Sequence, residues 1–74
     1  MSPFKPETND LRADRAEGVV RLYAQEVYPP GHLEADPETV IQDFLTDLRH
    51  LCDRRKVDFH DVLQRANSRY AEER

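Results

Sequence analysis

The sequence has one cysteine, two glycines, no tryptophan and no long apolar run, and these shortages exclude several classes of protein. The single cysteine, Cys52, has no partner for an internal disulfide, so we expect a reducing, cytoplasmic setting. A membrane-spanning helix needs roughly 18 consecutive apolar residues, and no run here approaches that length. Residues 1–6 also contain no apolar signal-peptide core. We therefore expect no membrane partner.

Basic residues are also in short supply, because 11 lysines and arginines face 15 aspartates and glutamates, giving a net charge of −4. Neither half of the chain is basic, so general affinity for nucleic acid is not the first expectation. The 74 residues make one domain at most. Their apolar side chains are clustered rather than diluted, which favours a folded domain over a disordered chain.

Two prolines and the absence of any apolar period predict a flexible tail over residues 1–9, followed by a single helical domain over residues 10–72. A first helix is expected over residues 11–27, because apolar residues recur there at spacings of three and four. Its predicted inner stripe consists of Ala16, Val19, Val20, Tyr23 and Val27. The segment Tyr28-Pro29-Pro30-Gly31 ends this helix, and residues 32–35 complete the loop.

A second helix is predicted over residues 37–55, with the clearest start in the chain. Asp36 is a natural N-cap, and Pro37 suits the first helical position, where a missing N–H costs nothing. The apolar residues form a stripe wider than about 100°, typical of a helix that packs on two neighbours. They are Val40, Ile41, Phe44, Leu45, Leu48, Leu51 and Cys52.

A third helix is predicted over residues 59–71, with Asp58 as its N-cap. Its apolar stripe consists of Phe59, Val62, Leu63, Ala66 and Tyr70. Because the turn at Lys56-Val57 is short, we expect the second and third helices to form a helical hairpin. The sequence thus predicts an all-α fold of three short amphipathic helices, whose roughly fifteen inward apolar side chains share one interior.

Such an interior provides little stabilisation for a chain in which we see no disulfide or structural metal site. Self-association is one way to bury more apolar surface. We therefore expect a protein partner or a homo-oligomer. Three apolar residues lie off the main stripe of the first helix and are candidate interface contacts: Leu11, Leu22 and Tyr28.

Asp43, Asp47, His50 and Arg54 follow spacings of four, three and four, so they form a polar ladder along one side of the second helix. One interpretation is a solvated helix face. The other is a site where Asp43 and Asp47 hold Mg²⁺ or Mn²⁺ with water completing the shell. Outside that second interpretation, we expect no cofactor and no catalytic residue.

The second and third helices, joined by a short turn, also suggest a helix-turn-helix that binds DNA as an adaptor. Residue types that read bases or hold phosphate occur on the third helix: Gln64, Arg65, Asn67, Ser68 and Arg69. Asp58 and Asp61, however, lie at the end that would enter the groove and would repel phosphate. Nucleic acid is therefore not an expected partner.

The run Asp43-Phe44-Leu45-Thr46-Asp47-Leu48-Arg49-His50-Leu51-Cys52-Asp53, with Asp58-Phe59, Leu63 and Tyr70, resembles short bacterial and phage proteins of unknown function. That resemblance implies a helical hairpin and no particular activity. The chain also resembles the MazG-like nucleotide pyrophosphohydrolases. That second resemblance implies a divalent-metal-dependent nucleotide hydrolase in which Asp43 and Asp47 stand in for the ligands of the metal-binding helix, four apart where the family has three. Our first hypothesis is a non-enzymatic interaction or self-associating module; the hydrolase and the DNA-binding adaptor are the alternatives.

Overall fold

The structure is a computed structural model, and it describes residues 9–73. Within this range it contains four helices and no strand, which confirms the predicted all-α fold. The helices are α1 (Asn9–Val27), α2 (His32–Ala35), α3 (Pro37–Arg54) and α4 (Phe59–Glu73). The predicted tail lies outside the described residues except for Asn9, which is the first residue of α1.

The expectation of a loop over residues 32–35 is wrong, because the structure shows the single helical turn α2 there. Gly31 adopts a left-handed conformation with φ of 87°, which side chains disfavour and glycine permits. The amide of Ala35 then donates to the Gly31 carbonyl (3.0 Å), and the amide of Asp36 to the His32 carbonyl (2.8 Å). These two bonds close a helical turn that is too short to show a periodic apolar pattern.

Both predicted helix caps are confirmed. The Asp36 side chain accepts a hydrogen bond from the Thr39 amide (3.2 Å) at the start of α3, and Pro37 occupies the first helical turn. Hydrogen bonding from Thr39 lowers the pKa of the Asp36 carboxyl. At the start of α4, the Asp58 side chain accepts from the Asp61 amide (3.0 Å). Each cap satisfies a backbone N–H that has no partner inside its own helix.

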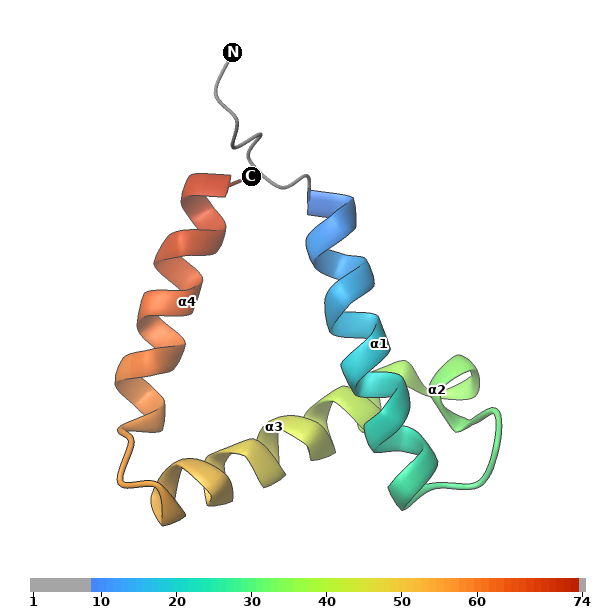
Figure 1. The fold of residues 1–74 in the computed structure, drawn as a ribbon. Helices are drawn as coiled ribbons and strands as arrows, with labels where there is room; N and C mark the ends of the chain where they lie inside the picture. The colour runs from blue at the N-terminus through green and yellow to red at the C-terminus, as the bar shows by residue number, and fades with distance from the viewer. Residues whose placement is uncertain (1–8, 74) are drawn as a thin grey trace.

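The turn between α3 and α4 depends on a left-handed residue that is not glycine. Lys56 has φ of 58°. The Val57 amide donates to the Cys52 carbonyl (2.8 Å), and the Lys56 amide to the Asp53 carbonyl (3.2 Å). This pair of bonds is a Schellman motif, which ends a helix by satisfying its last carbonyls. It turns the chain sharply, so that α4 leaves at a steep angle to α3 (Figure 1).

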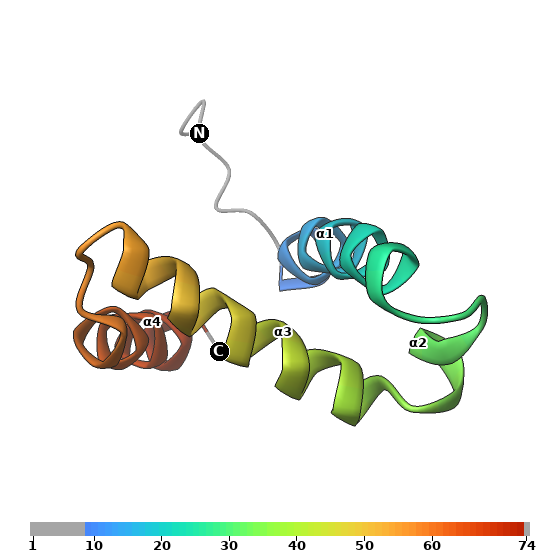
Figure 2. The same ribbon diagram turned by 90° about the horizontal axis from the view of Figure 1, so that it is seen from below.

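The three long helices form an open frame (Figures 1 and 2). α1 and α2 pack against the N-terminal half of α3, whereas α4 contacts α3 near its C-terminal end. The predicted hairpin of α3 and α4 is therefore a splayed one. The far ends of α1 and α4 meet at Glu73, whose carbonyl accepts from the Asn9 side chain (3.1 Å) and whose carboxylate pairs with Arg12 (3.3 Å).

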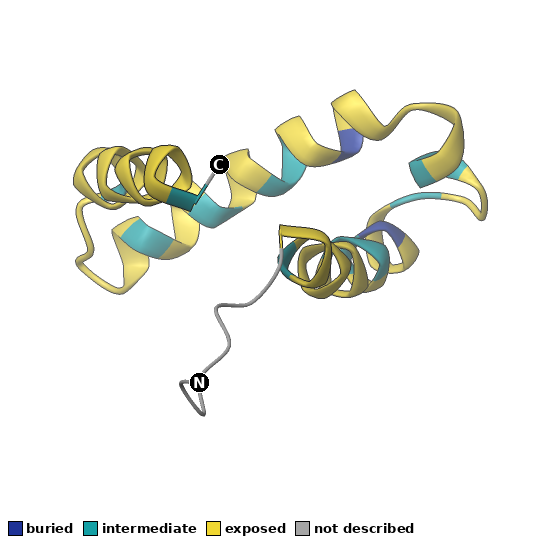
Figure 3. Cartoon of the chain, turned by 90° about the horizontal axis from the view of Figure 1, so that it is seen from above, coloured by how far each residue is buried: buried dark blue, intermediate teal, exposed yellow. Residues whose placement is uncertain are grey.

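The expected shared interior is not formed, and this part of the sequence-based interpretation is wrong. Among the described residues only Ala24 and Val40 are buried hydrophobic side chains, and most of each helix is exposed (Figure 3). The physical reason is the placement of the helices: α1 and α4 lie at opposite ends of α3, so their apolar stripes do not meet. The large apolar side chains left exposed are Leu11, Val19, Leu22, Val27, Ile41, Leu45, Leu51, Val57, Val62, Leu63 and Tyr70.

Candidate functional site

Two tyrosines of the α1 region donate hydrogen bonds to the two aspartates of the polar ladder on α3. The Tyr23 hydroxyl donates to the Asp47 carboxylate at 2.6 Å, and the Tyr28 hydroxyl donates to the Asp43 carboxylate. Asp43 and Asp47 are one turn apart on α3. Tyr23 lies near the C-terminal end of α1, and Tyr28 is the residue that follows this helix. The paired bonds therefore hold the C-terminal end of α1 against the middle of α3.

The rings of both tyrosines are also packed. Tyr23 meets Phe44 edge to face, with ring centroids 5.1 Å apart and planes at 66°, and Tyr28 stacks on His32 at 4.4 Å. The hydrogen bond to Asp43 and partial burial raise the pKa of Tyr28 to about 12. The bond to Asp47 raises the pKa of Tyr23 further above its ordinary value. Both hydroxyls thus stay protonated and act as donors rather than as bases.

The same contacts bear on the proposed Mg²⁺ or Mn²⁺ site at Asp43 and Asp47. Each carboxylate already accepts a hydrogen bond from a tyrosine, and each would have to turn toward a metal with its other oxygen or lose that bond. Within residues 9–73, no three or more His, Cys, Asp or Glu side chains gather in a way that could hold a metal ion. His50 and Arg54 lie beside Asp47 at a shallow pocket of about 370 Å³. Metal binding there stays a prediction.

The three predicted interface residues occupy different environments. Tyr28 is half-buried and makes its main contacts within the chain, with Asp43 and His32. Leu22 and Leu11 are 65% and 49% exposed on α1. The sequence pattern predicts an interface role for Tyr28 because it lies off the stripe, whereas in the structure its ring and hydroxyl serve the packing of α1 on α3.

The residues that suggested DNA binding all lie on exposed positions of α4. Arg65 pairs with Asp61 at 2.9 Å, and Arg69 pairs with Glu73 at 3.5 Å. Both guanidinium groups thus have a carboxylate one turn away, which offsets the positive charge that would attract phosphate. DNA binding by α4 stays a prediction that these contacts do not favour.

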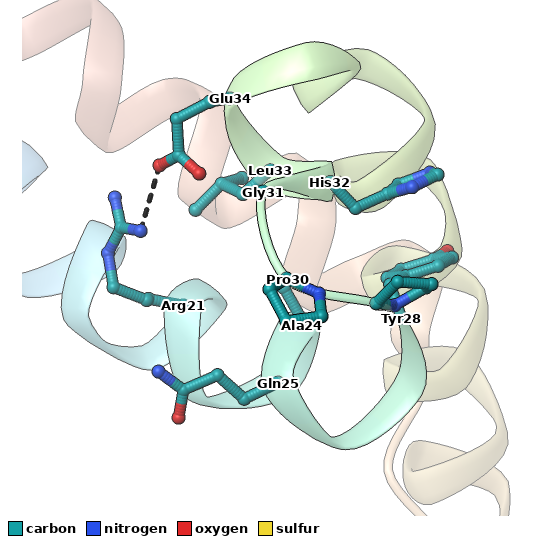
Figure 4. Close-up of a pocket in the computed structure, with 10 residues that line it drawn as sticks. Arg21, Ala24, Gln25, Tyr28, Pro30, Gly31, His32, Leu33 and Glu34 are labelled. Atoms are coloured by element: carbon teal, nitrogen blue, oxygen red, sulfur yellow. Dashed lines mark ion pairs between the residues drawn. The ribbon is translucent and has the colours of Figure 1, made fainter.

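A small pocket of about 420 Å³ lies between the end of α1 and the loop that leads to α2 (Figure 4). At one side Arg21 forms ion pairs with Glu34 (2.8 Å) and Glu17 (3.2 Å), and the stacked Tyr28 and His32 rings lie at the other. Hydrogen bonding from Arg21 lowers the pKa of the Glu34 carboxyl. Because its cation is already neutralised by two carboxylates, this pocket is poorly suited to an anionic ligand.

A larger apolar groove of about 510 Å³, here called the α3–α4 groove, runs along α3 to the start of α4. Ile41, Leu45 and Leu63 line it and are 46%, 41% and 39% exposed. At one end the Arg49 guanidinium lies over the Phe59 ring, 5.8 Å from its centroid. Its other lining residues are Glu38, Gln42 and Thr46.

A second apolar depression, with a volume of about 520 Å³, is here called the α1–α3 patch. It adjoins the α3–α4 groove, since Ile41 lines both. It is formed mainly by small and medium apolar side chains, with charged groups beside them. The lining residues are Ala13, Ala16, Glu17, Val20, Arg21, Leu33, Glu34, Pro37 and Ile41. The groove and the patch are the parts of the apolar helix stripes that no other helix covers. Adjoining apolar surfaces with charged residues beside them are candidates for an interaction site.

Comparison with protein-family models, with curated proteins and with solved structures finds no significant match. No helix within residues 9–73 is both long enough and apolar enough to cross a membrane.

Proposed function

We propose that this chain is a non-enzymatic helical module that functions by associating with a second copy of itself. The association surface is the α3–α4 groove together with the α1–α3 patch. A cytoplasmic setting, which the single cysteine favours, belongs to the same proposal.

The observation that carries the proposal is the exposure of the apolar stripes. Helices in small proteins are stabilised mainly by burying an amphipathic face. Here α4 has no buried residue at all, although it carries an apolar stripe formed by Phe59, Val62, Leu63, Ala66 and Tyr70. A second copy that covers the stripe would supply the burial that the single chain does not provide.

The exposed area has the size that a dimer needs. The chain exposes 6643 Å², whereas a compact chain of its mass exposes about 4,700 Å². Even if residues 1–8 and 74 contributed the area of an unfolded chain, residues 9–73 would still expose roughly 800 Å² more than a compact chain of their size. A standard protein–protein interface buries about 800 Å² on each partner. The excess area therefore matches what one partner of a two-chain interface buries.

The test is sedimentation velocity over a wide range of protein concentration. We expect the wild-type chain to sediment as a dimer that dissociates on dilution. Leu45→Glu places a charge inside the α3–α4 groove and should shift the protein to monomer. Leu22→Glu is the matched control, since Leu22 is also an exposed leucine but lies outside the groove and the patch.

Circular dichroism of both variants shows whether the helices persist. If the wild-type chain remains monomeric at every concentration, the proposal is wrong, and the groove then serves a different protein or none. If Leu22→Glu dissociates the dimer and Leu45→Glu does not, the association surface is the opposite side of α1, as the sequence pattern suggested.

A further inference from the structure

The α3–α4 groove carries one acidic and one basic side chain, separated along α3. Glu38 and Arg49 both line it, and both are exposed. They are eleven positions apart, which is about three helical turns, so they lie on nearly the same face roughly 16 Å apart. Neither forms an ion pair within residues 9–73, in contrast to the arginines at positions 21, 65 and 69.

This arrangement is complementary to itself under a two-fold rotation. An axis that passes midway along this stretch of α3 exchanges position 38 with position 49 and position 42 with position 45. Two antiparallel copies of α3 would therefore place Glu38 of each chain beside Arg49 of the other, and Leu45 over the stem of Gln42. A parallel arrangement would instead place like charges together. Symmetric pairing of one patch with itself is the usual form of a two-chain interface.

From this charge pattern we infer that the two copies pair through α3 in an antiparallel, two-fold arrangement, with Glu38 and Arg49 as the pair that sets orientation. The inference rests on the self-association proposed above. The apolar surfaces agree with it independently. Phe59 and Leu63 lie near the C-terminal end of α3, and Leu33 and Pro37 near its N-terminal end. Antiparallel pairing brings each apolar end onto the other.

Charge reversal followed by mixing tests the arrangement. Glu38→Arg puts two arginines together at both ends of the dimer, and Arg49→Glu puts two glutamates together. Each variant alone should dimerise about tenfold more weakly than wild type, since like charges across an interface are unfavourable. An equimolar mixture of the two variants should restore dimerisation, because every contact between the chains then joins opposite charges. A pair within one chain cannot be rescued by mixing.

The matched control is Asp61→Arg mixed with Arg65→Asp, which reverses an ion pair that joins two residues of one α4. Mixing these variants should give no gain over either alone. The mixture is read by sedimentation with one variant labelled. If the wild-type chain dimerises and the Glu38→Arg and Arg49→Glu mixture gains nothing, the antiparallel arrangement is wrong while self-association stands. If the wild-type chain is monomeric, the proposed function fails and this inference with it.

Discussion

Tyr23 of α1 donates a 2.6 Å hydrogen bond to Asp47 of α3, twenty-four residues further along the chain. This bond joins two helices whose apolar contact is small, since Ala24 and Val40 are the buried hydrophobic side chains of residues 9–73. The Tyr28–Asp43 bond lies one turn away on α3, so two polar pairs stabilise the contact between α1 and α3. Several measurable consequences follow from these bonds and from the local backbone.

Tyr23→Phe removes the hydroxyl but keeps the ring against Phe44. We expect the free energy of unfolding to fall by up to about 1 kcal/mol, the net contribution of a typical hydrogen bond. Chemical denaturation monitored by circular dichroism measures the change. Tyr70→Phe is the control, since Tyr70 is 65% exposed on α4 and should leave stability unchanged. Equal effects of the two substitutions would contradict a specific role for the Tyr23–Asp47 bond.

The tyrosines also predict a dependence of stability on alkaline pH. The pKa of Tyr28 is raised to about 12 in the folded chain by its bond to Asp43, whereas an unfolded tyrosine titrates near 10. Because the folded state holds the proton more tightly, the stabilisation is complete below about pH 10 and is lost as the pH rises toward about 12. Phenolate absorbance together with circular dichroism follows both events.

The comparison for this pH effect is Tyr28→Phe, which removes the group while leaving the other titrating side chains in place. The difference between wild type and Tyr28→Phe should shrink over this pH range. A constant difference across it would show that Tyr28 titrates alike in the folded and unfolded chains, contrary to the structure.

The two glycines should respond to alanine in opposite directions. Gly18 is helical and a Cβ there would meet nothing within 4 Å, so Gly18→Ala should stabilise the chain by about 1 kcal/mol through helix propensity. Gly31 has φ of 87°, so Gly31→Ala should destabilise it by about 1 kcal/mol although space is available. Thermal unfolding at matched concentration compares them. A stabilising Gly31→Ala would contradict the left-handed turn before α2.

Lys56→Gly should increase stability, because Lys56 occupies the left-handed position of the Schellman motif at φ of 58°. The expected gain is roughly 0.5–1 kcal/mol, the strain of a side chain in that conformation less the added entropy of the unfolded chain. Arg55→Gly is the control, since Arg55 has φ of −89° and gains nothing from glycine. Urea denaturation midpoints of the two variants test the prediction.

Val40→Ala should be the most destabilising valine truncation in the chain. Val40 is fully buried where α3 meets its neighbours, and removing its methyl groups leaves a void that costs about 2 kcal/mol. Val19→Ala, at a valine that is 52% exposed, should cost almost nothing. If both truncations have the same effect on the unfolding free energy, the contact of α1 with α3 differs from the one described.

The long helices and their starts were predictable from sequence because the signals are local. A cap such as Asp36 or Asp58 acts on an amide three residues away, so its effect does not depend on the rest of the fold. The one-turn helix α2 was missed because four residues carry no period. The turn at Lys56 was predicted only as short, since its left-handed residue is a lysine where a glycine is the usual signal.

The candidate site was less predictable. The residue spacing places Asp43 and Asp47 on one ladder, but it does not show that Tyr23 and Tyr28 are their partners. The sequence pattern instead predicts Tyr23 in the core and Tyr28 at an interface. A signal was present, since a packed tyrosine needs a partner for its hydroxyl. Residue spacing does not reveal the register of α1 on α3. That register determines which carboxylate each tyrosine hydroxyl reaches.

The apolar stripes themselves follow from residue spacing, because helical periodicity places every third or fourth side chain on one face. Whether two stripes cover each other depends on the directions in which the helices leave their turns. Here the turns at Gly31 and Lys56 send α1 and α4 to opposite ends of α3. That tertiary arrangement turns residues such as Ile41, Leu45 and Leu63 from an expected interior into an exposed groove.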